Sequence, residues 1–287
     1  MIKKFSFIIF KLIKFIDFIL KKTINKTFIV YLNGQLIKKT YKSRNILGKK
    51  INFFTPNELT YSRVVNFFDS EPETLEWIDS FDKDKKIIFW DIGANIGLYS
   101  IYNALKNRHS ETISFEPSSS NLRVFTRNIS INNLENNIKL FPIPLTNKQN
   151  SFLIMREGDF IEGGALNSFG ENFNFEGKKF ESKMKYNLYG TTINYLINNQ
   201  ILKVPNYIKI DVDGIEHLIL EGADQFLSDS KIKSLSIEIN ENFNDQLNKV
   251  LDIMKKNGFK ILHKKQNKEL SLNEGKFSET FNYIFIR

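Results

Sequence analysis

A loop with two glycines, followed along the chain by an acidic residue, has the residue types and spacing of a ligand site. The loop from Asp91 to Gly97 (DIGANIG) directly follows an apolar segment and precedes a helical one. Gly93 and Gly97 allow a tight turn and a close approach of the backbone to a ligand. Glu116 ends the next apolar segment, where a carboxylate can accept both hydroxyls of a ribose. The pattern predicts a site for a ligand that contains a ribose.

The acid in front of the first glycine indicates which kind of ligand fits. A pyrophosphate cradle has the pattern G-x-G-x-x-G, which this loop lacks, so a nicotinamide-dependent oxidoreductase is disfavoured. An acid suits a ligand with a cationic amino-acid end. S-adenosylmethionine joins an adenosine to a zwitterionic, sulfonium-bearing tail. We therefore expect it as the ligand.

A second group of ionisable residues lies in two later apolar segments. Asp211 ends one of them, Lys209 lies two residues earlier on the same face, and Glu238 lies in the next segment. A lysine in a buried strand needs a partner, and Asp211 or Glu238 could serve. With His217 in the following helix, these residues are the candidates for taking a proton from an acceptor hydroxyl. His217 lies off the apolar face of its helix, so we expect it to be exposed.

Two further acids have a structural explanation. Asp213 and Glu216 stand three residues apart at a helix start, which is the spacing of a capping box.

The strand-end acids could alternatively bind Mg²⁺, which would polarise a hydroxyl. We favour a site without a metal ion.

The elements that position these residues alternate between strand and helix from Lys85 to the C-terminus. Alternation of this kind predicts a doubly wound α/β sheet that is mostly parallel. The last two strands have no helix between them and should form an antiparallel pair at one edge. Residues 151–155 should add a hairpin extension, followed by a loop-rich stretch over 156–185. The expected strands are 87–91, 112–116, 138–141, 207–211, 234–239, 259–262 and 281–286, and the expected helices are 96–106, 118–132, 215–227 and 245–257.

The N-terminal residues are strongly basic. Residues 1–50 contain thirteen Lys or Arg and one acid, Asp17, although the 287-residue chain has a net charge of only +9. Lys11, Lys14 and Asp17 interrupt the apolar run that a signal peptide or a spanning helix requires. Residues 1–22 instead predict an amphipathic helix that either contacts an anionic membrane surface or docks on protein.

The expected organisation has three parts. Residues 1–26 form the basic amphipathic helix, 27–84 a small appendage, and 85–287 the catalytic domain. Within the appendage, short β-prone runs on both sides of Asn33-Gly34 predict a hairpin, and Pro72 predicts a helix start. The chain has no cysteine, which excludes disulfides and thiolate nucleophiles and fits a reducing, cytoplasmic location.

Taken together, the motifs resemble the FkbM-type methyltransferases. The resemblance rests on residues 91–97, on Phe115-Glu116-Pro117 and on 208–223 (IKIDVDGIEHLILEGA), with further matches at 71–78, 191–193 and 237–239. It implies a Rossmann-like, seven-stranded methyltransferase fold, S-adenosylmethionine as methyl donor, and O-methylation of sugars or other hydroxylated small molecules. The residues it implies for donor binding are Asp91, Gly93, Ala94, Asn95, Gly97, Glu116 and Asp211.

We therefore expect an O-methyltransferase acting on a sugar, glycan or glycolipid precursor, in the cytoplasm or at the inner face of a membrane. One alternative is an RNA ribose 2′-O-methyltransferase using Lys209 and Asp211. Nucleic acid is not the favoured partner, because the basic residues lie in an amphipathic segment. A second alternative is a non-catalytic, membrane-associated scaffold that binds the donor. The sequence does not indicate an oligomeric state.

Overall fold

The computed structural model describes residues 1–82, 85–266 and 277–287, and the chain forms two compact units, Met1–Lys42 and Ser43–Arg287. Each unit is described by itself. Residue 84, the expected end of the appendage, lies outside the described residues.

The first unit is a pair of helices, α1 (Ile2–Ile24) and α2 (Ile29–Ile37). The hairpin predicted around Asn33-Gly34 is wrong, because both residues lie inside α2. The side chain of Asp17 explains this: its Oδ1 accepts hydrogen bonds from the Phe28 N–H at 2.8 Å and the Ile29 N–H at 3.2 Å. These groups belong to the first turn of α2, so Asp17 supplies acceptors that favour a helix there. No helix among the residues described is long and apolar enough to cross a membrane.

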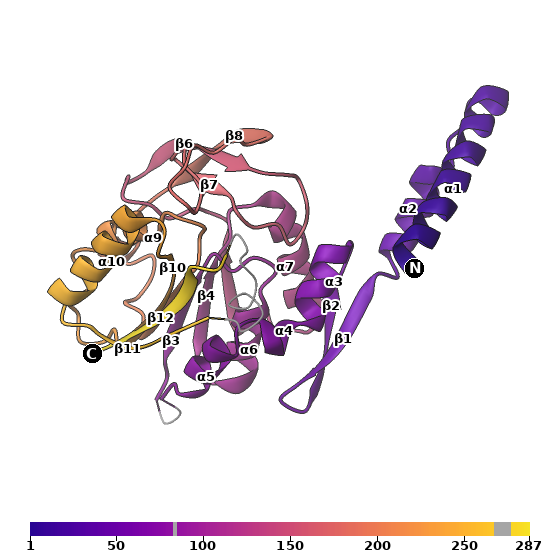
Figure 1. Ribbon diagram of the computed structural model, residues 1–287. Coiled ribbons are helices and arrows are strands. Elements are labelled where there is room, and N and C mark those ends of the chain that lie inside the picture. Colours follow the sequence, from indigo (N-terminus) through magenta and orange to yellow (C-terminus); the bar gives the residue numbers. More distant parts are fainter. Residues whose placement is uncertain (83–84, 267–276) are drawn as a thin grey trace. The chain divides into compact units, whose positions relative to one another are not determined.

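The second unit is built on a seven-stranded sheet, which Figure 1 shows between two layers of helices. The strand order is β11-β12-β10-β9-β3-β4-β5. Strands β10, β9, β3, β4 and β5 are parallel, whereas β12 runs antiparallel to both β10 and β11. The expected α/β sheet with an antiparallel edge pair is confirmed. Its strands are β3 (Ile88–Ile92), β4 (Glu111–Phe115), β5 (Ile138–Phe141), β9 (Tyr207–Ile210), β10 (Ser234–Asn240), β11 (Lys260–Lys265) and β12 (Thr280–Ile286).

Helices cover both faces of this sheet. One layer contains α5 (Pro72–Asp79), α6 (Leu98–Lys106) and α7 (Ser119–Ile131), and the other contains α9 (Glu216–Glu221) and α10 (Asn244–Lys256) (Figure 1). The central strands are buried on both sides, which explains why β3 and β9 are apolar apart from Asp91 and Lys209. Helix α5 begins at Pro72, as predicted, and leaves Glu71 just outside its first turn.

The remaining elements flank the sheet. Strands β1 (Tyr41–Ile46) and β2 (Lys49–Phe54) form a hairpin. The short helices α3 (Glu58–Val65) and α4 (Phe67–Ser70) follow it. Residues 151–155, the expected hairpin extension, lie in β6 (Ser151–Glu157), which pairs with β7 (Ser168–Phe169) and β8 (Met184–Gly190) in a small antiparallel sheet. Within the stretch expected to be loop, β7 is a short strand that the sequence did not predict. Helix α8 (Ile193–Asn198) leads from it to β9.

Candidate active site

A cavity of about 990 Å³ lies at the carboxyl ends of the central strands. Strand β3 has β9 on one side and β4 on the other, so the strand order changes direction here, and such a switch point is the usual ligand site of a doubly wound sheet. The volume is at the upper end of the roughly 300–1,000 Å³ typical of ligand pockets, which leaves room for two ligands. The cavity joins the two residue groups predicted from sequence, since Gly93, Ala94, Asn95, Glu116, Lys209, Asp211 and Glu238 all line it.

The loop after β3 owes its shape to close backbone packing. Gly93 has a φ of 85°, and a Cβ there would lie 1.8 Å from the backbone oxygen of Asp211. A Cβ on Gly97 would lie 2.0 Å from the Phe125 ring. Any larger residue would push the loop away from β9 or α7, so both glycines hold the cavity floor against its neighbours.

Glu116 is fixed by the same loop. Its two carboxylate oxygens accept hydrogen bonds from the Asn95 N–H at 2.7 Å and the Ser118 N–H at 2.8 Å. Burial raises the pKa of Glu116 to about 8, although these hydrogen bonds and one from Asn121 oppose the shift. The carboxyl group therefore stands at the cavity wall in a fixed position and can bind hydroxyl groups.

Asn95 connects this loop to the segment that follows β6. Its amide donates to the Gly164 carbonyl at 2.8 Å, and Asn121 donates to the same carbonyl at 3.1 Å. The buried Asn95 Oδ1 accepts no hydrogen bond within the described part of the chain. A buried acceptor without a donor is costly, so this oxygen is suited to a ligand donor such as an ammonium group.

Asp91 lies beneath the cavity floor and is absent from the lining formed by the described residues. It is fully buried, and Ser100 donates to its Oδ2. Burial raises the pKa of Asp91, and the charge of Lys209 on the neighbouring strand opposes this shift. The role of Asp91 in donor binding stays a prediction.

Lys209 is the centre of the second group. Its ammonium lies 2.6 Å from the Asp211 carboxylate and 3.9 Å from that of Glu71, and the side chain is 2% exposed. Burial alone would lower the pKa of Lys209, but the charges of Asp211, Glu71 and Asp91 raise it above its usual value. Lys209 is therefore held as an ammonium by its acidic neighbours, which disfavours it as a base.

The acids near Lys209 outnumber this one cation. Glu238 lies in β10, two residues beyond Ser236, which is the register partner of Lys209. Burial raises the pKa of Glu238 well above its usual range, and Asp211 and Glu71 add to the shift. Burial also raises the pKa of Glu71. Over the described residues, no group of three or more His, Cys, Asp or Glu is arranged to hold a metal ion.

The capping box predicted for Asp213 and Glu216 is wrong. Asp213 has a φ of 64° and accepts from the Leu166 N–H at 2.6 Å, so it ties the segment after β6 to the cavity instead of capping α9. Burial raises the pKa of Asp213 to about 6. Glu216 accepts from the N–H groups of Val212 and Gly214 and from Gln246, and burial raises its pKa to about 8.

His217 differs from the prediction in its exposure. The side chain is buried, not exposed, because Phe173 and Phe243 pack against the imidazole with ring centroids 6.5 and 6.1 Å away. Burial lowers the pKa of His217, so the ring is neutral. His217 is not among the described residues that line the cavity, so it lies apart from Lys209, Asp211 and Glu238.

Sequence reasoning missed Glu71 and Tyr99. Both line the cavity, and a hydrogen bond to Glu71 contributes to the raised pKa of Tyr99, after burial and the charges of Glu71 and Asp211. Glu71 precedes the Pro72 that starts α5, so it stands outside the helix with its carboxylate directed to Lys209. The one available signal was its place at the start of the 71–78 segment in the family resemblance.

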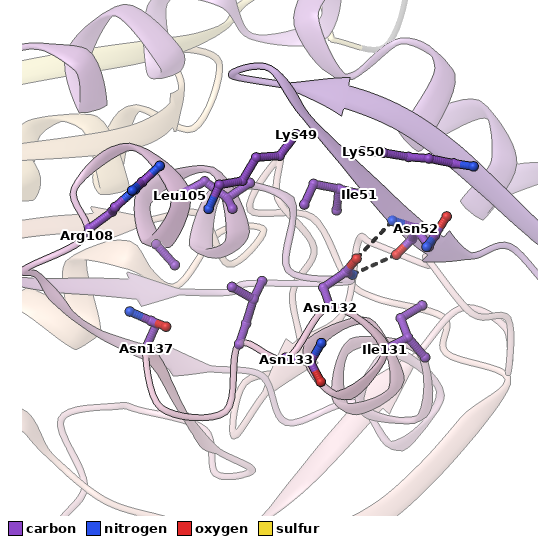
Figure 2. Close-up of a pocket in the computed structure, with 12 residues that line it drawn as sticks. Lys49, Lys50, Ile51, Asn52, Leu105, Arg108, Ile131, Asn132, Asn133 and Asn137 are labelled. Carbon is purple, nitrogen blue, oxygen red and sulfur yellow. Dashed lines mark hydrogen bonds between the residues drawn. The ribbon is translucent and has the colours of Figure 1, made fainter.

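A second cavity of about 430 Å³ lies at the opposite ends of the strands, between β2 and the ends of α6 and α7 (Figure 2). Lys49, Lys50 and Arg108 line it. The C-terminal ends of two helices face this region, and cations near helix C-termini are stabilising, so a structural role explains them. Figure 2 also shows the paired hydrogen bonds between Asn52 and Asn132, which fasten β2 to α7.

Comparison with known proteins places this site in a class and then in a family. The sheet, its glycine loop and its strand-end acid define a Rossmann-like methyltransferase fold. Residues 91–261 match the methyltransferase FkbM domain, which is more than half of the chain, and the chain belongs to this family. It is therefore an S-adenosylmethionine-dependent methyltransferase. The searched curated proteins contain no relative that matches.

Several solved structures are similar. Methyltransferase FkbM from Methylobacillus flagellatus is 13% identical with a TM-score of 0.47, over 90% of this chain and 58% of that one. Precorrin-6y C5,15-methyltransferase from Geobacter metallireducens is 13% identical with a TM-score of 0.42, over 76% and 86%. TrmK of M. capricolum, solved with S-adenosylhomocysteine, is 12% identical with a TM-score of 0.42, over 74% and 66%.

Proposed function

We propose that the protein transfers the methyl group of S-adenosylmethionine to a hydroxyl of a sugar, glycan or glycolipid precursor. The observation that carries this proposal is the acid cluster around Lys209, which opens into the same cavity as the Glu116 loop. One part of the cavity suits the donor, and the other can take a proton from an acceptor.

The proposed donor position follows from the chemistry of the lining. Glu116 would accept the ribose hydroxyls, and Asn95 Oδ1 would accept from the ammonium of the methionine end. Gly93, Ala94 and Gly97 would shape the backbone beside it. Asp211 would then lie near the sulfonium, where a negative charge is favourable.

The charges of the reaction balance in this arrangement. The oxygen–methyl bond forms as the sulfur–methyl bond breaks, so the sulfonium becomes a neutral sulfide. The hydroxyl releases one proton. The cluster of Glu71, Asp211 and Glu238 would therefore face a positive charge before the transfer, and Glu71 or Glu238, whose pKa values are raised, can hold a proton after it. Alignment of the two reactants supplies much of the remaining rate.

Glu238 is our choice for the base. Lys209 is held as an ammonium, Asp211 is paired with it, and His217 lies away from the cavity. Burial raises the pKa of Glu238, and the positive charge of a bound sulfonium would lower it again, which favours the ionised form that a general base requires. Asp211 and Glu71 would position Lys209 and the acceptor.

The acceptor side of the cavity supports a sugar as substrate class. Phe175, Phe180 and Phe277 provide apolar ring faces, while Asn167, Asn174 and Glu181 provide hydrogen-bonding groups. A few polar groups on a largely apolar wall are typical of pockets that orient a small ligand. The absence of cysteine supports a cytoplasmic location as part of the proposal.

A turnover assay with S-adenosylmethionine tests the proposal. The acceptors would be a panel of nucleotide sugars, glycans and glycolipid extracts, with RNA transcripts as the competing class, and mass spectrometry would locate the added methyl group. We expect methylation of a sugar hydroxyl and a loss of about 10²–10⁴-fold in kcat for Glu238→Gln. Glu135→Gln, at an exposed position, is the matched control. Methylation of RNA alone would overturn the substrate class, and donor binding without turnover on any acceptor would favour the scaffold.

A further inference from the structure

The unit Met1–Lys42 carries the entire net charge of the protein. It contains ten lysines and one acid, Asp17, which gives +9, the formal net charge of the whole chain. The unit Ser43–Arg287 is therefore neutral overall. The lysines lie in α1 and in the segments on either side of α2, which itself has no charged residue. A charge concentrated in one small unit, and absent in sum from the rest, indicates that this unit meets a negatively charged partner.

The single acid of this unit is used inside it. The Asp17 carboxylate is buried, and besides its two backbone hydrogen bonds it accepts the Thr27 hydroxyl at 2.6 Å. The Thr27 hydrogen bond, helped by the Ile29 and Phe28 N–H groups, lowers the pKa of Asp17 to about 2 against the opposing effect of burial. Asp17 therefore stays ionised and ties α1 to the start of α2, so the exposed charged side chains of the unit are all lysines.

Helix α1 also exposes an apolar arc. Successive residues of a helix are 100° apart, which puts seven large side chains within an arc of about 120°. Each of them is at least 41% exposed, and Phe5, Ile8 and Phe15 exceed 59%. An exposed apolar surface of this extent marks an interaction site. The arc consists of Phe5, Ile8, Ile9, Leu12, Phe15, Ile16 and Ile19.

The lysine side of α1 has phenylalanines of its own. The ammonium of Lys11 lies 4.7 Å from the ring centroid of Phe7, that of Lys14 lies 5.9 Å from Phe10, and that of Lys22 lies 4.8 Å from Phe18. Each pair is four residues apart, so the lysine reaches over the ring of the preceding turn. Cations above aromatic rings are well placed at a boundary between water and hydrocarbon.

We propose that residues Met1–Lys42 form a helical hairpin that binds the surface of a membrane containing anionic phospholipid. Helix α1 would lie in the plane of the interface with its apolar arc among the acyl chains and its lysines at the headgroups. The charge selects this partner: a second copy of the chain would bring the same +9, and the neutral second unit offers no net attraction. The proposal goes beyond the methyl-transfer function and is tested without activity.

Vesicle flotation of the full chain tests this surface. The vesicles would be phosphatidylcholine alone and phosphatidylcholine mixed with phosphatidylglycerol, each at low and high salt. We expect binding to the mixed vesicles only, weakened by salt. Lys11→Gln/Lys14→Gln should weaken it by about 30-fold, from about 1 kcal/mol for each lysine near the surface. Lys255→Gln/Lys256→Gln, the same charge change at the end of α10, should leave it unchanged.

The apolar arc has its own variant. Leu12→Ser/Ile16→Ser should abolish most of the vesicle binding while the lysines remain, because the buried apolar area drives insertion. Glu116→Ala should leave it unchanged, which separates this proposal from the function of the cavity. Equal binding to both vesicle types would overturn the anionic selectivity. A full chain that binds neither type of vesicle would overturn the proposal. If sedimentation then shows a dimer, and Leu12→Ser/Ile16→Ser dissociates it, the apolar arc is a subunit contact.

Discussion

At one end of the cavity a carboxylate is held by the backbone, and at the other end carboxylates are held by a buried cation. Glu116 takes its position from two N–H groups in its own neighbourhood, those of Asn95 and Ser118. Asp211 and Glu71 take theirs from Lys209. The first arrangement depends on the geometry of backbone N–H groups and the second on the balance of charges around one cation. Loss of a single group should therefore have different consequences at the two ends.

The largest expected effect is on stability at the Lys209 end. Lys209→Met would leave buried acids without their cation, and removal of one partner of a buried pair typically costs about 3–5 kcal/mol. Lys209 lowers the pKa of Glu71 and Asp91, so both values would rise further in the variant. An acid whose folded pKa is raised loses stability as pH rises, so the deficit should be largest above neutrality and shrink as pH falls.

Urea unfolding of wild type and variant across this pH range measures the effect. The matched control is Lys265→Met, which removes an exposed ion pair with Glu76 and should change the free energy of unfolding little, because solvent screens such pairs. An equal, pH-independent loss in both variants would mean that the acids at the cavity do not depend on Lys209.

At the Glu116 end the expected effect is on donor binding instead. Glu116→Ala should weaken S-adenosylmethionine binding by about 100-fold, because the buried ribose hydroxyls would lose their acceptor, at a cost of about 1–3 kcal/mol each. Titration calorimetry measures this, with Glu111→Ala at the other end of β4 as control. A folded Glu116→Ala that binds the donor as wild type does would remove Glu116 from the donor site.

A contrast between determinants that are near in the sequence and those that are distant explains what could be predicted from sequence. The Gly93 loop and Glu116 were found because each is coded by a few adjacent residues at a strand end. The sheet was found because buried strands form apolar runs. Glu71 was missed because it reaches Lys209 from a segment that precedes the first strand of the sheet.

The errors follow the same rule. Asn33-Gly34 is a good local turn signal, but Asp17, more than ten residues away, favours a helix there. His217 lies off the apolar face of α9, yet Phe173 from the segment after β6 covers it. Asp213 has the spacing of a cap, but its positive φ turns the carboxylate toward Leu166. In each case a distant partner overrides a correct local preference.

Glu216 offers an intermediate test, since it is buried like the Lys209 cluster and held by backbone N–H groups like Glu116. Its folded pKa of about 8 lies above the usual 4.5, so wild type loses stability as pH rises from the lower value through the higher. Glu216→Gln cannot ionise, and the Gln246 amide can turn to pair with it. As the pH rises from about 5 to about 8.5, the free energy of unfolding of the variant should therefore increase relative to that of wild type by on the order of 2 kcal/mol. Parallel pH profiles of unfolding free energy would contradict this.

The smallest effect is expected at His217. This residue lies outside both the Glu116 end and the Lys209 end of the cavity, so its variant shows what a change elsewhere does. The neutral ring packs between Phe173 and Phe243, and its Nδ1 has no hydrogen-bond partner in the described residues. His217→Phe keeps an aromatic ring there and removes a buried unpaired nitrogen, so stability should change by less than about 1 kcal/mol. The kcat and its pH profile should stay as in wild type, because the imidazole does not reach the cavity. A fall of about 100-fold in kcat, the lower range for loss of a general base, would make His217 the base in place of Glu238.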